Sequence, residues 1–492
     1  MTTTWVNETW PPRRALRTAH LRHWASVACL ALSDAAAFAV AWLLIRDGVN
    51  LPSIVLLGSQ ARPQSTPIDV FAILGLAFIL VRYLAGDYGR RQPFWDGAKN
   101  TTIALIVTAL FDLAMIALGQ GVYPVLPAAL SWLFLLVALP LGRQAMRAVM
   151  SRMGIWRIPT ALIGNSERSP AIYASLNGTL SLGFNVRWLV SEDPDTAPAR
   201  ELSRLNHIHS SDPESFAALL VQAGCEQAIV ATENMDHSAE VVQRLLEVNM
   251  AVAVVPPLNR LPLAGLTASN FFGHDILLLQ VRNNVRRLPY RLAKRAFDVT
   301  VSALLLLLFS PLLMVLALIV RRTDGGPSTY APWRIGRNGV AFRCIKFRTM
   351  AVDADARLAQ FEHEQPALFA EYQRTFKIRN DPRVTPIGRW LRRTSLDELP
   401  QLWNVLKGDM SLVGPRPVLQ RELDEHYGPA AQLYTRTRPG MTGLWQVSGR
   451  SNTSYAERVV MDEWYILNWS FWYDIVILIQ TAWIVVIGKG AV

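Results

Sequence analysis

An adjacent pair of acidic residues, Asp397-Glu398, lies in a stretch of the chain that is rich in arginine, glycine and proline. Guanidinium groups held on turns by glycine and proline suit bidentate binding of phosphate. A carboxylate among them suits coordination of Mg²⁺, or attack on a phosphorus atom whose charge the metal neutralises. These residue types therefore indicate phosphoryl-type transfer on an anionic substrate. The arginines concerned are Arg389, Arg392, Arg393, Arg416, Arg436, Arg438 and Arg450.

The same acidic pair has a purely structural alternative. Ser395 and Glu398 have the spacing of a capping box, and Asp397 would then favour the positive end of a helix dipole. Adjacent acids are most often solvated surface residues, so the pair alone does not identify a site. The surrounding arginines favour the chemical interpretation, and no Ser-His-Asp order, zinc-ligand spacing or Walker loop competes with it.

A β-hairpin is predicted before the acids, in the segment YAPWRIGRNGVAFRCIKFRTM. Its two β-rich arms flank Asn338-Gly339, a dipeptide that strongly favours a tight hairpin turn. We expect the second arm to carry Lys346 and Arg348, which adds two cations to the candidate phosphate-binding set.

An apolar segment over residues 301–320 must place this polar region relative to a membrane. By length alone it predicts a fifth transmembrane helix. Both of its flanks are strongly basic, and basic flanks belong in the cytoplasm. Pro311 should bend the helix, and Ser310 can bond a backbone carbonyl that the bend leaves free. We therefore expect a re-entrant helix over residues 299–320 that bends at Ser310-Pro311 and returns to the cytoplasmic side.

Four further apolar segments open the chain, each near the length that a membrane-spanning helix needs. The N-terminus and the connections after the second and fourth segments are basic, so both ends of residues 1–152 are expected in the cytoplasm. Asp34 and Asp112 lie inside two segments, where a functional role and a polar contact between helices are both open. The segments are Trp24–Ile45, Ile68–Ala85, Thr101–Leu118 and Leu126–Met146.

The composition agrees with an integral membrane protein. Of 492 residues, 51% are hydrophobic, and they are clustered along the chain. The net charge of +11 lies beside apolar segments and turns, which suits anionic lipid headgroups or a phosphorylated substrate. No nucleic-acid-binding motif accompanies this charge, so a nucleic acid is not expected as a partner. The three cysteines have neither metal-ligand spacing nor a disulfide pattern, which predicts a reducing compartment.

Residues 155–285 alternate β-rich runs with helical stretches, which predicts βαβ units on a parallel sheet in a Rossmann-like α/β domain. The first turn reads LIGNSERS and offers only Gly164 where a dinucleotide site needs three glycines. We therefore expect no bound dinucleotide and a structural, regulatory or dimerising role, with which a homodimer is compatible.

The predicted architecture has three parts. An α-helical membrane bundle is followed by the α/β domain and then by an α+β, membrane-associated catalytic domain over residues 286–492. The chain closes with an apolar helix that is interrupted by Asp474 and Gln480 and is rich in tryptophan. This pattern is typical of a helix that lies in the membrane interface.

From about Leu288 to its end, the chain resembles the bacterial polyprenyl-phosphate sugar-1-phosphate transferases, which are monotopic phosphoglycosyl transferases. The first 285 residues make it similar to the large members, such as undecaprenyl-phosphate galactose phosphotransferase. The matching segments keep the order of the family: KRAFD, FSPLL, KFRTM, LRRTSLDELPQLWNVLKGDMSLVGPRP, RPGMTGLWQVSGR and DEWYILNWSFWYDI.

The resemblance implies transfer of a hexose 1-phosphate from a UDP-sugar to undecaprenyl phosphate, with Mg²⁺ and with release of UMP. This reaction begins O-antigen, capsule or exopolysaccharide synthesis. It further implies a multi-pass protein of the bacterial inner membrane, in contact with membrane lipids, with its catalytic domain facing the cytoplasm. Galactose is favoured over glucose by resemblance only, and the sequence does not decide which hexose is carried.

The resemblance also assigns roles to single residues. Asp397 would be the nucleophile that forms a phosphosugar-aspartyl intermediate, and Glu398 would hold Mg²⁺ with Asp462 nearby. Ser310-Pro311 would be the break of the family's re-entrant helix. The substrate phosphates or uridine would meet Lys346, Arg392, Arg416 and Arg450, and the lipid phosphate would meet Lys294 and Arg295.

Two rivals from other classes remain. A non-enzymatic membrane scaffold for polysaccharide assembly would not need the acidic pair and the arginines, which this chain retains. A nucleotide-sugar oxidoreductase or epimerase would need the missing glycines and a Tyr-x-x-x-Lys pair in residues 155–285, which that segment lacks.

Overall fold

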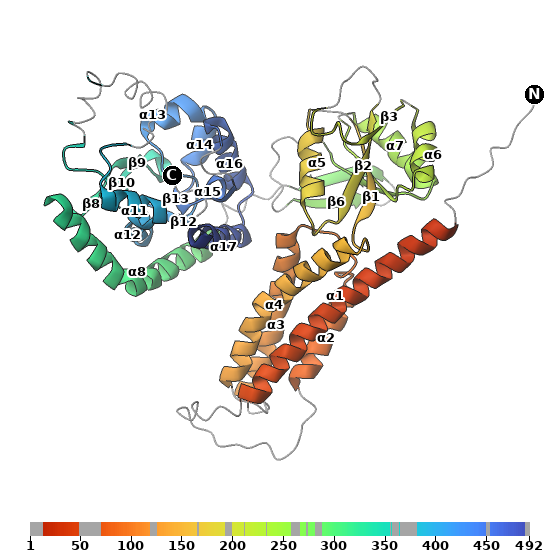
Figure 1. The fold of residues 1–492 in the computed structure, drawn as a ribbon, viewed down its shortest axis with the longest axis horizontal. Helices are drawn as coiled ribbons and strands as arrows, with labels where there is room; N and C mark the ends of the chain where they lie inside the picture. The colour runs from red at the N-terminus through yellow and green to blue at the C-terminus, as the bar shows by residue number, and fades with distance from the viewer. Residues whose placement is uncertain are drawn as a thin grey trace, which may run out of the picture. The chain divides into compact units, whose positions relative to one another are not determined.

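The fold comes from a computed structural model of the chain (Figure 1). It divides into two compact units, Met1–Leu258 and Asn259–Val492. The residues that the structure describes are 13–48, 70–118, 125–164, 167–191, 199–210, 212–232, 234–256, 266–271, 274–280, 288–354, 356, 364, 381–448 and 453–487.

Four apolar helices open the first unit, as predicted. Three of them are long and apolar enough to cross a membrane, and the other has 15 described residues. They pack through an aromatic core in which Phe71 and Trp132 lie 5.0 Å apart between ring centroids. Leucines such as Leu76 and Leu110 point outward and are exposed, which suits a lipid environment. The helices are α1 (Arg13–Gly48), α2 (Val70–Leu84), α3 (Phe94–Ala117) and α4 (Val125–Arg152).

The two acids inside these helices make contacts between helices. Asp34 of α1 accepts hydrogen bonds from Arg143 Nε of α4 and from Tyr88 Oη, both at 2.8 Å. Asp112 of α3 accepts a hydrogen bond from Trp132 Nε1 of α4 at 2.7 Å. The contact interpretation is therefore confirmed for both acids, and these partners offset the cost of burying each carboxylate.

A five-stranded parallel sheet follows, with strand order β3-β2-β1-β4-β5. Four of its strands contain the predicted β-rich runs, and β3 was not predicted because it is only four residues long and polar. The strands are β1 (Ile158–Ile163), β2 (Phe184–Ser191), β3 (Asn206–His209), β4 (Gln227–Val230) and β5 (Ala251–Val254). The helices between them are α5 (Ser169–Gly178), α6 (Pro213–Gln222) and α7 (Met235–Glu247).

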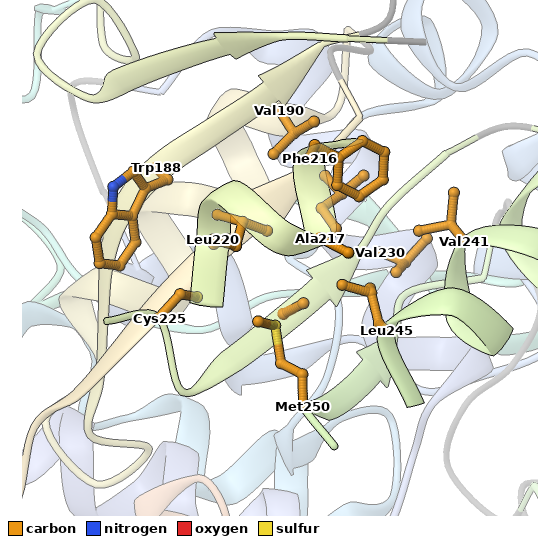
Figure 2. Packing of buried hydrophobic residues seen from close by; sticks show 13 residues of the cluster. Trp188, Val190, Phe216, Ala217, Leu220, Cys225, Val230, Val241, Leu245 and Met250 are labelled. Atoms are coloured by element: carbon orange, nitrogen blue, oxygen red, sulfur yellow. The ribbon is translucent and has the colours of Figure 1, made fainter. Parts of the chain in front are cut away.

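Helices cover both faces of this sheet, because successive side chains of a strand point to opposite faces. Ala161 and Ile163 of β1 belong to the hydrophobic cluster formed with α6 and α7, and Leu162 belongs to the cluster formed with α5. Figure 2 shows the first cluster, in which Phe216 and Leu220 of α6 lie over the strands. The residues after Gly164 that a dinucleotide site would use, 165–166, lie outside the described part of the chain.

The second unit contains the long helix α8 (Leu288–Asp324), which extends the predicted 299–320 at both ends. Its first half packs on the polar domain: Asp298 accepts hydrogen bonds from Ser411 Oγ at 2.8 Å and from the Leu412 amide at 3.2 Å. Its second half packs on the same domain, through Leu316 and Val320 against a cluster with Phe347 and Leu391. Both ends of α8 are thus held by one folded body.

The middle of α8 departs from a straight rod. A straight helix of 37 residues would be about 55 Å long, and Figure 1 shows the ribbon of α8 bending midway. Pro311 has no N–H for the carbonyl of Leu307, and Ser310 Oγ donates a hydrogen bond to that carbonyl at 2.8 Å, as expected from the sequence. Leu307, Leu308 and Met314 beside the proline are 75%, 69% and 72% exposed.

The remaining elements form the mixed helix and strand body of the second unit. The predicted hairpin is present as β9 and β10, and Asn338 in its turn has a left-handed φ of 59°. Lys346 does not lie on that hairpin, contrary to prediction: it belongs to a separate strand, β11, that pairs with β8. The chain turns away after Arg343 because Cys344 bonds back to Pro332, which ends the hairpin pairing.

The bounds of these elements complete the fold. The strands are β6 (Thr267–Phe271), β7 (His274–Gln280), β8 (Thr329–Tyr330), β9 (Trp333–Ile335), β10 (Ala341–Arg343), β11 (Lys346–Phe347), β12 (Ser411–Val413) and β13 (Gly440–Thr442). The helices are η3 (Arg337–Gly339), α11 (Pro386–Thr394), η4 (Leu396–Glu398), α12 (Gln401–Lys407), α13 (Gln420–Glu422), η5 (Leu423–Tyr427), α14 (Ala430–Tyr434), α15 (Leu444–Ser448), α16 (Tyr455–Leu467) and α17 (Phe471–Ile487).

Candidate active site

The acidic pair lies in a single tight turn between two helices. α11 ends at Ser395, whose left-handed φ of 58° reverses the chain. The short helix η4 then carries Asp397 and Glu398, and α12 begins directly afterwards at Gln401. Since helices are fixed by packing on either side, this turn holds the two carboxylates in place.

The capping-box interpretation of this pair is wrong. The Ser395 side chain makes no capping hydrogen bond, because the residue is already in the left-handed conformation that ends α11. Glu398 instead accepts a hydrogen bond from Lys346 Nζ at 2.6 Å, and the two side chains are 31% and 30% exposed. The acid is thus tied to a strand 52 residues earlier in the chain.

The segment after β11 supports the turn from a second point. Thr349 Oγ1 accepts a hydrogen bond from Arg392 Nε at 2.9 Å, and the Thr349 carbonyl accepts one from the Thr385 amide at 3.0 Å. Thr385 also caps α11, because its Oγ1 accepts a hydrogen bond from the Gly388 amide at 3.0 Å. Residues 346–349 therefore bind both the start of α11 and the turn that follows it.

Asp397 is the electrostatically unusual residue of the turn. Its carboxyl is half-buried, and loss of hydration together with the neighbouring Glu398 raises its pKa to about 6. Lys346 and Arg392 oppose that rise, so two cations face the group. A carboxylate of this kind is ionised at neutral pH and poorly hydrated, as a nucleophile toward phosphorus should be.

Arg416 and Asp462 form a neighbouring cluster. The Arg416 guanidinium lies 5.5 Å from the centroid of the Trp445 ring, and Arg458 lies 4.9 Å from the same ring. Asp462 on α16 is 2% exposed and accepts a hydrogen bond from Tyr427 Oη at 2.9 Å. Burial raises the pKa of Asp462 to about 7, and the charge of Arg416 opposes that rise.

The predicted lipid-phosphate residues bond to the protein itself. Lys294 Nζ donates hydrogen bonds to Asp474 Oδ2 of α17 at 2.5 Å and to the Val413 carbonyl at 3.1 Å. Arg295 donates to the carbonyls of Val405 and Leu406, at the end of α12, at 2.7 and 2.8 Å. These contacts join α8 to α12 and α17, and binding of a lipid phosphate by this pair stays a prediction.

The structure thus brings together Lys346, Arg392, Asp397 and Glu398, and it places Arg416 and Asp462 in the cluster with Trp445. Arg450 lies outside the described residues. Sequence reasoning missed Thr349 and Thr385, whose hydrogen bonds position the turn. A Thr-Pro pair at 385–386, ahead of an amphipathic run, was an available helix-start signal for Thr385, and nothing in the sequence singled out Thr349.

Gly388 permits the close contact between α11 and Thr349. A Cβ atom at this position would lie 2.0 Å from the Thr349 carbonyl oxygen and 2.7 Å from its carbon, both of them backbone atoms. We expect Gly388→Ala to destabilise the domain by about 1–3 kcal/mol or more and to lower activity by displacing Arg392. Thermal unfolding of purified protein measures the first effect. Gly339→Ala is the matched control for the loss of a glycine, since a Cβ there has nothing within 4 Å; an equal loss of stability in both variants would contradict the explanation.

Comparisons with known proteins agree with this site. The family described as bacterial sugar transferase matches residues 289–488. An undecaprenyl-phosphate galactose phosphotransferase of Salmonella typhimurium is 38% identical over 407 residues, which are 82% of this chain and 84% of that protein. An undecaprenyl-phosphate glucose phosphotransferase of Komagataeibacter xylinus is 38% identical over 468 residues, 87% of this chain and 80% of that protein.

A third relative is shorter. The exopolysaccharide production protein ExoY of Rhizobium meliloti is 50% identical over 200 residues, which are 41% of this chain and 88% of that protein. The part of the chain that carries Asp397 and Glu398 therefore corresponds to nearly the whole of a separate protein. With a family match over this part and a relative that matches most of both chains, the protein is a membrane-embedded enzyme that belongs to the bacterial sugar transferases.

Proposed function

We propose that this protein transfers a hexose 1-phosphate from a UDP-sugar to undecaprenyl phosphate and releases UMP. The observation that carries the proposal is Asp397, a half-buried carboxylate with a pKa of about 6 that faces Lys346 and Arg392 in a fixed turn. The names of the relatives in Salmonella typhimurium and Komagataeibacter xylinus support the lipid acceptor. They differ in the sugar, galactose in one and glucose in the other, and we favour galactose.

The proposed chemistry takes two displacements at one phosphorus atom. An Asp397 carboxylate oxygen attacks the phosphorus that bears the sugar, and the bond from that phosphorus to the bridging oxygen breaks, so that UMP leaves with the electron pair. A phosphate oxygen of the lipid then attacks the same phosphorus, and the bond to Asp397 breaks and restores the carboxylate. Lys346 and Arg392 lie where they can stabilise the charge on the phosphate oxygens in both steps.

Glu398 is the residue that fits a Mg²⁺ ion. Magnesium in phosphoryl-transfer enzymes is held by one or two carboxylates, with water and substrate phosphate completing the shell. Among the described residues no cluster of three or more acidic, histidine or cysteine side chains is present, which agrees with such a minimal site. Bound there, the ion would neutralise phosphate charge, and Lys346 would give up part of its contact with Glu398. The metal role predicted for Asp462 has less support, since its contacts are with Tyr427 and Arg416.

We also propose that α8 is re-entrant and that the catalytic domain faces the cytoplasm of the bacterial inner membrane. Both halves of α8 pack on the same domain, and the exposed leucines lie around the proline between them. A straight spanning helix would carry one end across the bilayer, away from the contacts of Asp324 with Arg348 or of Asp298 with Ser411. UDP-sugars are cytoplasmic, which supports the same side for the site.

The α/β domain is proposed to be Rossmann-like without a dinucleotide. The strand order 3-2-1-4-5 with helices on both faces is that of a doubly wound sheet. Gly164 has a φ of 112°, and a Cβ there would lie 2.8 Å from the Ala231 carbonyl oxygen. This glycine is therefore explained by packing between β1 and β4, and it needs no cofactor.

A panel of UDP-sugars tests the proposed function. Purified full-length protein in detergent with Mg²⁺ and undecaprenyl phosphate should release UMP from UDP-galactose and, at least tenfold more slowly, from UDP-glucose. Release of UDP in place of UMP would mean that the sugar alone is transferred, and it would contradict the proposal. Faster turnover of UDP-glucose would contradict only the choice of sugar.

The pKa of Asp397 predicts a pH profile. Only the carboxylate attacks phosphorus, so the rate should be nearly full above pH 7 and should fall as the pH drops through about 6. At pH 5 we expect about a tenfold loss in kcat/KM for the UDP-sugar, relative to pH 7. Asp462 has a pKa of about 7, so the profile is repeated in Asp462→Asn, which should keep the inflection near pH 6. An inflection that disappears in Asp462→Asn would assign it to that residue.

A further inference from the structure

A cavity of about 560 Å³ lies in the second unit, beside the first turns of α8. Its wall is unusual in holding six basic side chains and one carboxylate, Asp298, which is already bonded to Ser411 and Leu412. The basic side chains are Arg291, Lys294, Arg295, Arg337, Arg436 and Arg438.

Half of these cations are balanced by the protein. Lys294 pairs with Asp474. Arg295 and Arg438 bond to carbonyls at the end of α12, Arg438 through its Nε to Gly408 at 2.8 Å, where the helix dipole is negative.

The other three cations, Arg291, Arg337 and Arg436, have no carboxylate partner among the described residues. Arg337 Nε is buried and makes no hydrogen bond. Burial first, and then the guanidinium groups of Arg295, Arg337 and Arg291, lower the pKa of Arg438. Like charges gathered without a counter-ion repel each other, and a bound anion with several oxygens would remove that cost.

The cavity is separate from the proposed catalytic site. Its wall contains none of Lys346, Arg392, Asp397 or Glu398. The bonded carbonyls of Val405 and Gly408 lie at the far end of α12 from the acidic pair. Seven helical residues rise about 10 Å, so an anion among these arginines is too distant to react at Asp397.

Apolar side chains form the rest of the wall. Leu288 and Leu292 on α8 line the cavity and are 62% and 60% exposed. Leu433 and Trp469 line it from other elements. The cavity thus combines a phosphate-binding set of arginines with a greasy rim on the helix that enters the membrane surface, and an inorganic ion would leave that rim unused.

We propose that this cavity is a second anion site that binds the phosphate group of a membrane lipid, with the phosphate among Arg291, Arg337 and Arg436 and the acyl chains passing Leu288 and Leu292. The site is not a substrate site: it fastens the catalytic domain to anionic lipid at the start of α8.

Native mass spectrometry of the full-length protein in neutral detergent tests this proposal. The probes are short-chain phosphatidylglycerol, phosphatidylcholine and inorganic phosphate, added separately. The variant is Arg337→Gln with Arg436→Gln, and the matched control is Arg200→Gln with Arg204→Gln, two exposed arginines of the other unit. We expect one tightly held phosphatidylglycerol, about tenfold or more weakened in the variant and unchanged in the control.

Thermal unfolding without lipid provides the second readout. Removing unbalanced charge should leave the unfolding temperature of the Arg337→Gln, Arg436→Gln variant unchanged or raise it, while the increase caused by phosphatidylglycerol should be lost. A lower unfolding temperature without lipid would show that the arginines are structural and would overturn the proposal. Equal binding of phosphatidylcholine would overturn the anion preference, and equal binding of inorganic phosphate would overturn the lipid.

Discussion

Replacing Asp397 by Asn is expected to lower turnover by a factor on the order of a thousand or more, about 4 kcal/mol in the activation barrier. The amide keeps the size and most of the hydrogen bonding of the side chain but is a far weaker nucleophile. Enzyme incubated with UDP-sugar alone should release UMP up to one equivalent and gain the mass of one hexose phosphate, because covalent catalysis separates the two half-reactions. Intact-protein mass spectrometry measures the adduct, which Asp397→Asn should lack.

Glu398→Gln distinguishes the roles of the two acids. As a metal ligand, Glu398 should also be needed for the first half-reaction, and removal of Mg²⁺ by a chelator should stop it. Asp424→Asn, in an exposed acidic stretch, is the control for removing a carboxylate from this domain. Full turnover by wild-type protein that never acquires the adduct would point to direct attack by the lipid phosphate and would leave Asp397 as a metal ligand.

The second large effect concerns the topology of α8. In a background in which Cys29, Cys225 and Cys344 are replaced by alanine, single cysteines at Leu288 and Arg322 should both resist a membrane-impermeant thiol reagent in intact cells. Both positions are exposed in the structure, so protection there reports the side of the membrane.

A cysteine at Gln120 controls for access of the reagent. It lies in the uncharged connection before α4, which the positive-inside rule places outside the cytoplasm, so it should be labelled. Labelling at Arg322 together with protection at Leu288 would establish a true span and exclude the re-entrant helix. Permeabilised cells should label all three positions.

The elements with strong periodic signals were predictable from the sequence. The apolar helices, the parallel strands and the turn at Asn338-Gly339 follow from local residue patterns. The ends of α8 were not, because Leu288 and Asp324 join the helix through contacts with distant parts of the domain, such as Asp324 with Arg348. Strand β3 was missed for a similar reason: its pairing with β2 holds it, and its residues carry no apolar alternation.

The candidate site shows the same division. Residue types and spacing were enough to select Asp397, Glu398 and the basic residues around them. They could not separate a capping serine from a left-handed one at Ser395, because both fit the same local pattern. Lys346 reaches Glu398 through a strand pairing that the hairpin signal concealed, and Lys294 is occupied by an acid 180 residues away. Such long-range pairs leave no trace in one sequence.

The buried pair between Asp34 and Arg143 has a consequence for the order in which the protein is made. The two residues are 109 positions apart, and Tyr88, the other partner of Asp34, follows it by 54. A ribosome adds about 5–20 residues per second, so the first helix enters the bilayer about 5–20 s before its guanidinium partner is synthesised. An unpaired acid near the middle of a membrane helix costs about 2.5–3.5 kcal/mol. The first helix therefore completes its insertion only when the fourth arrives, and a pause in translation between them prolongs the interval in which α1 can slip back out of the bilayer.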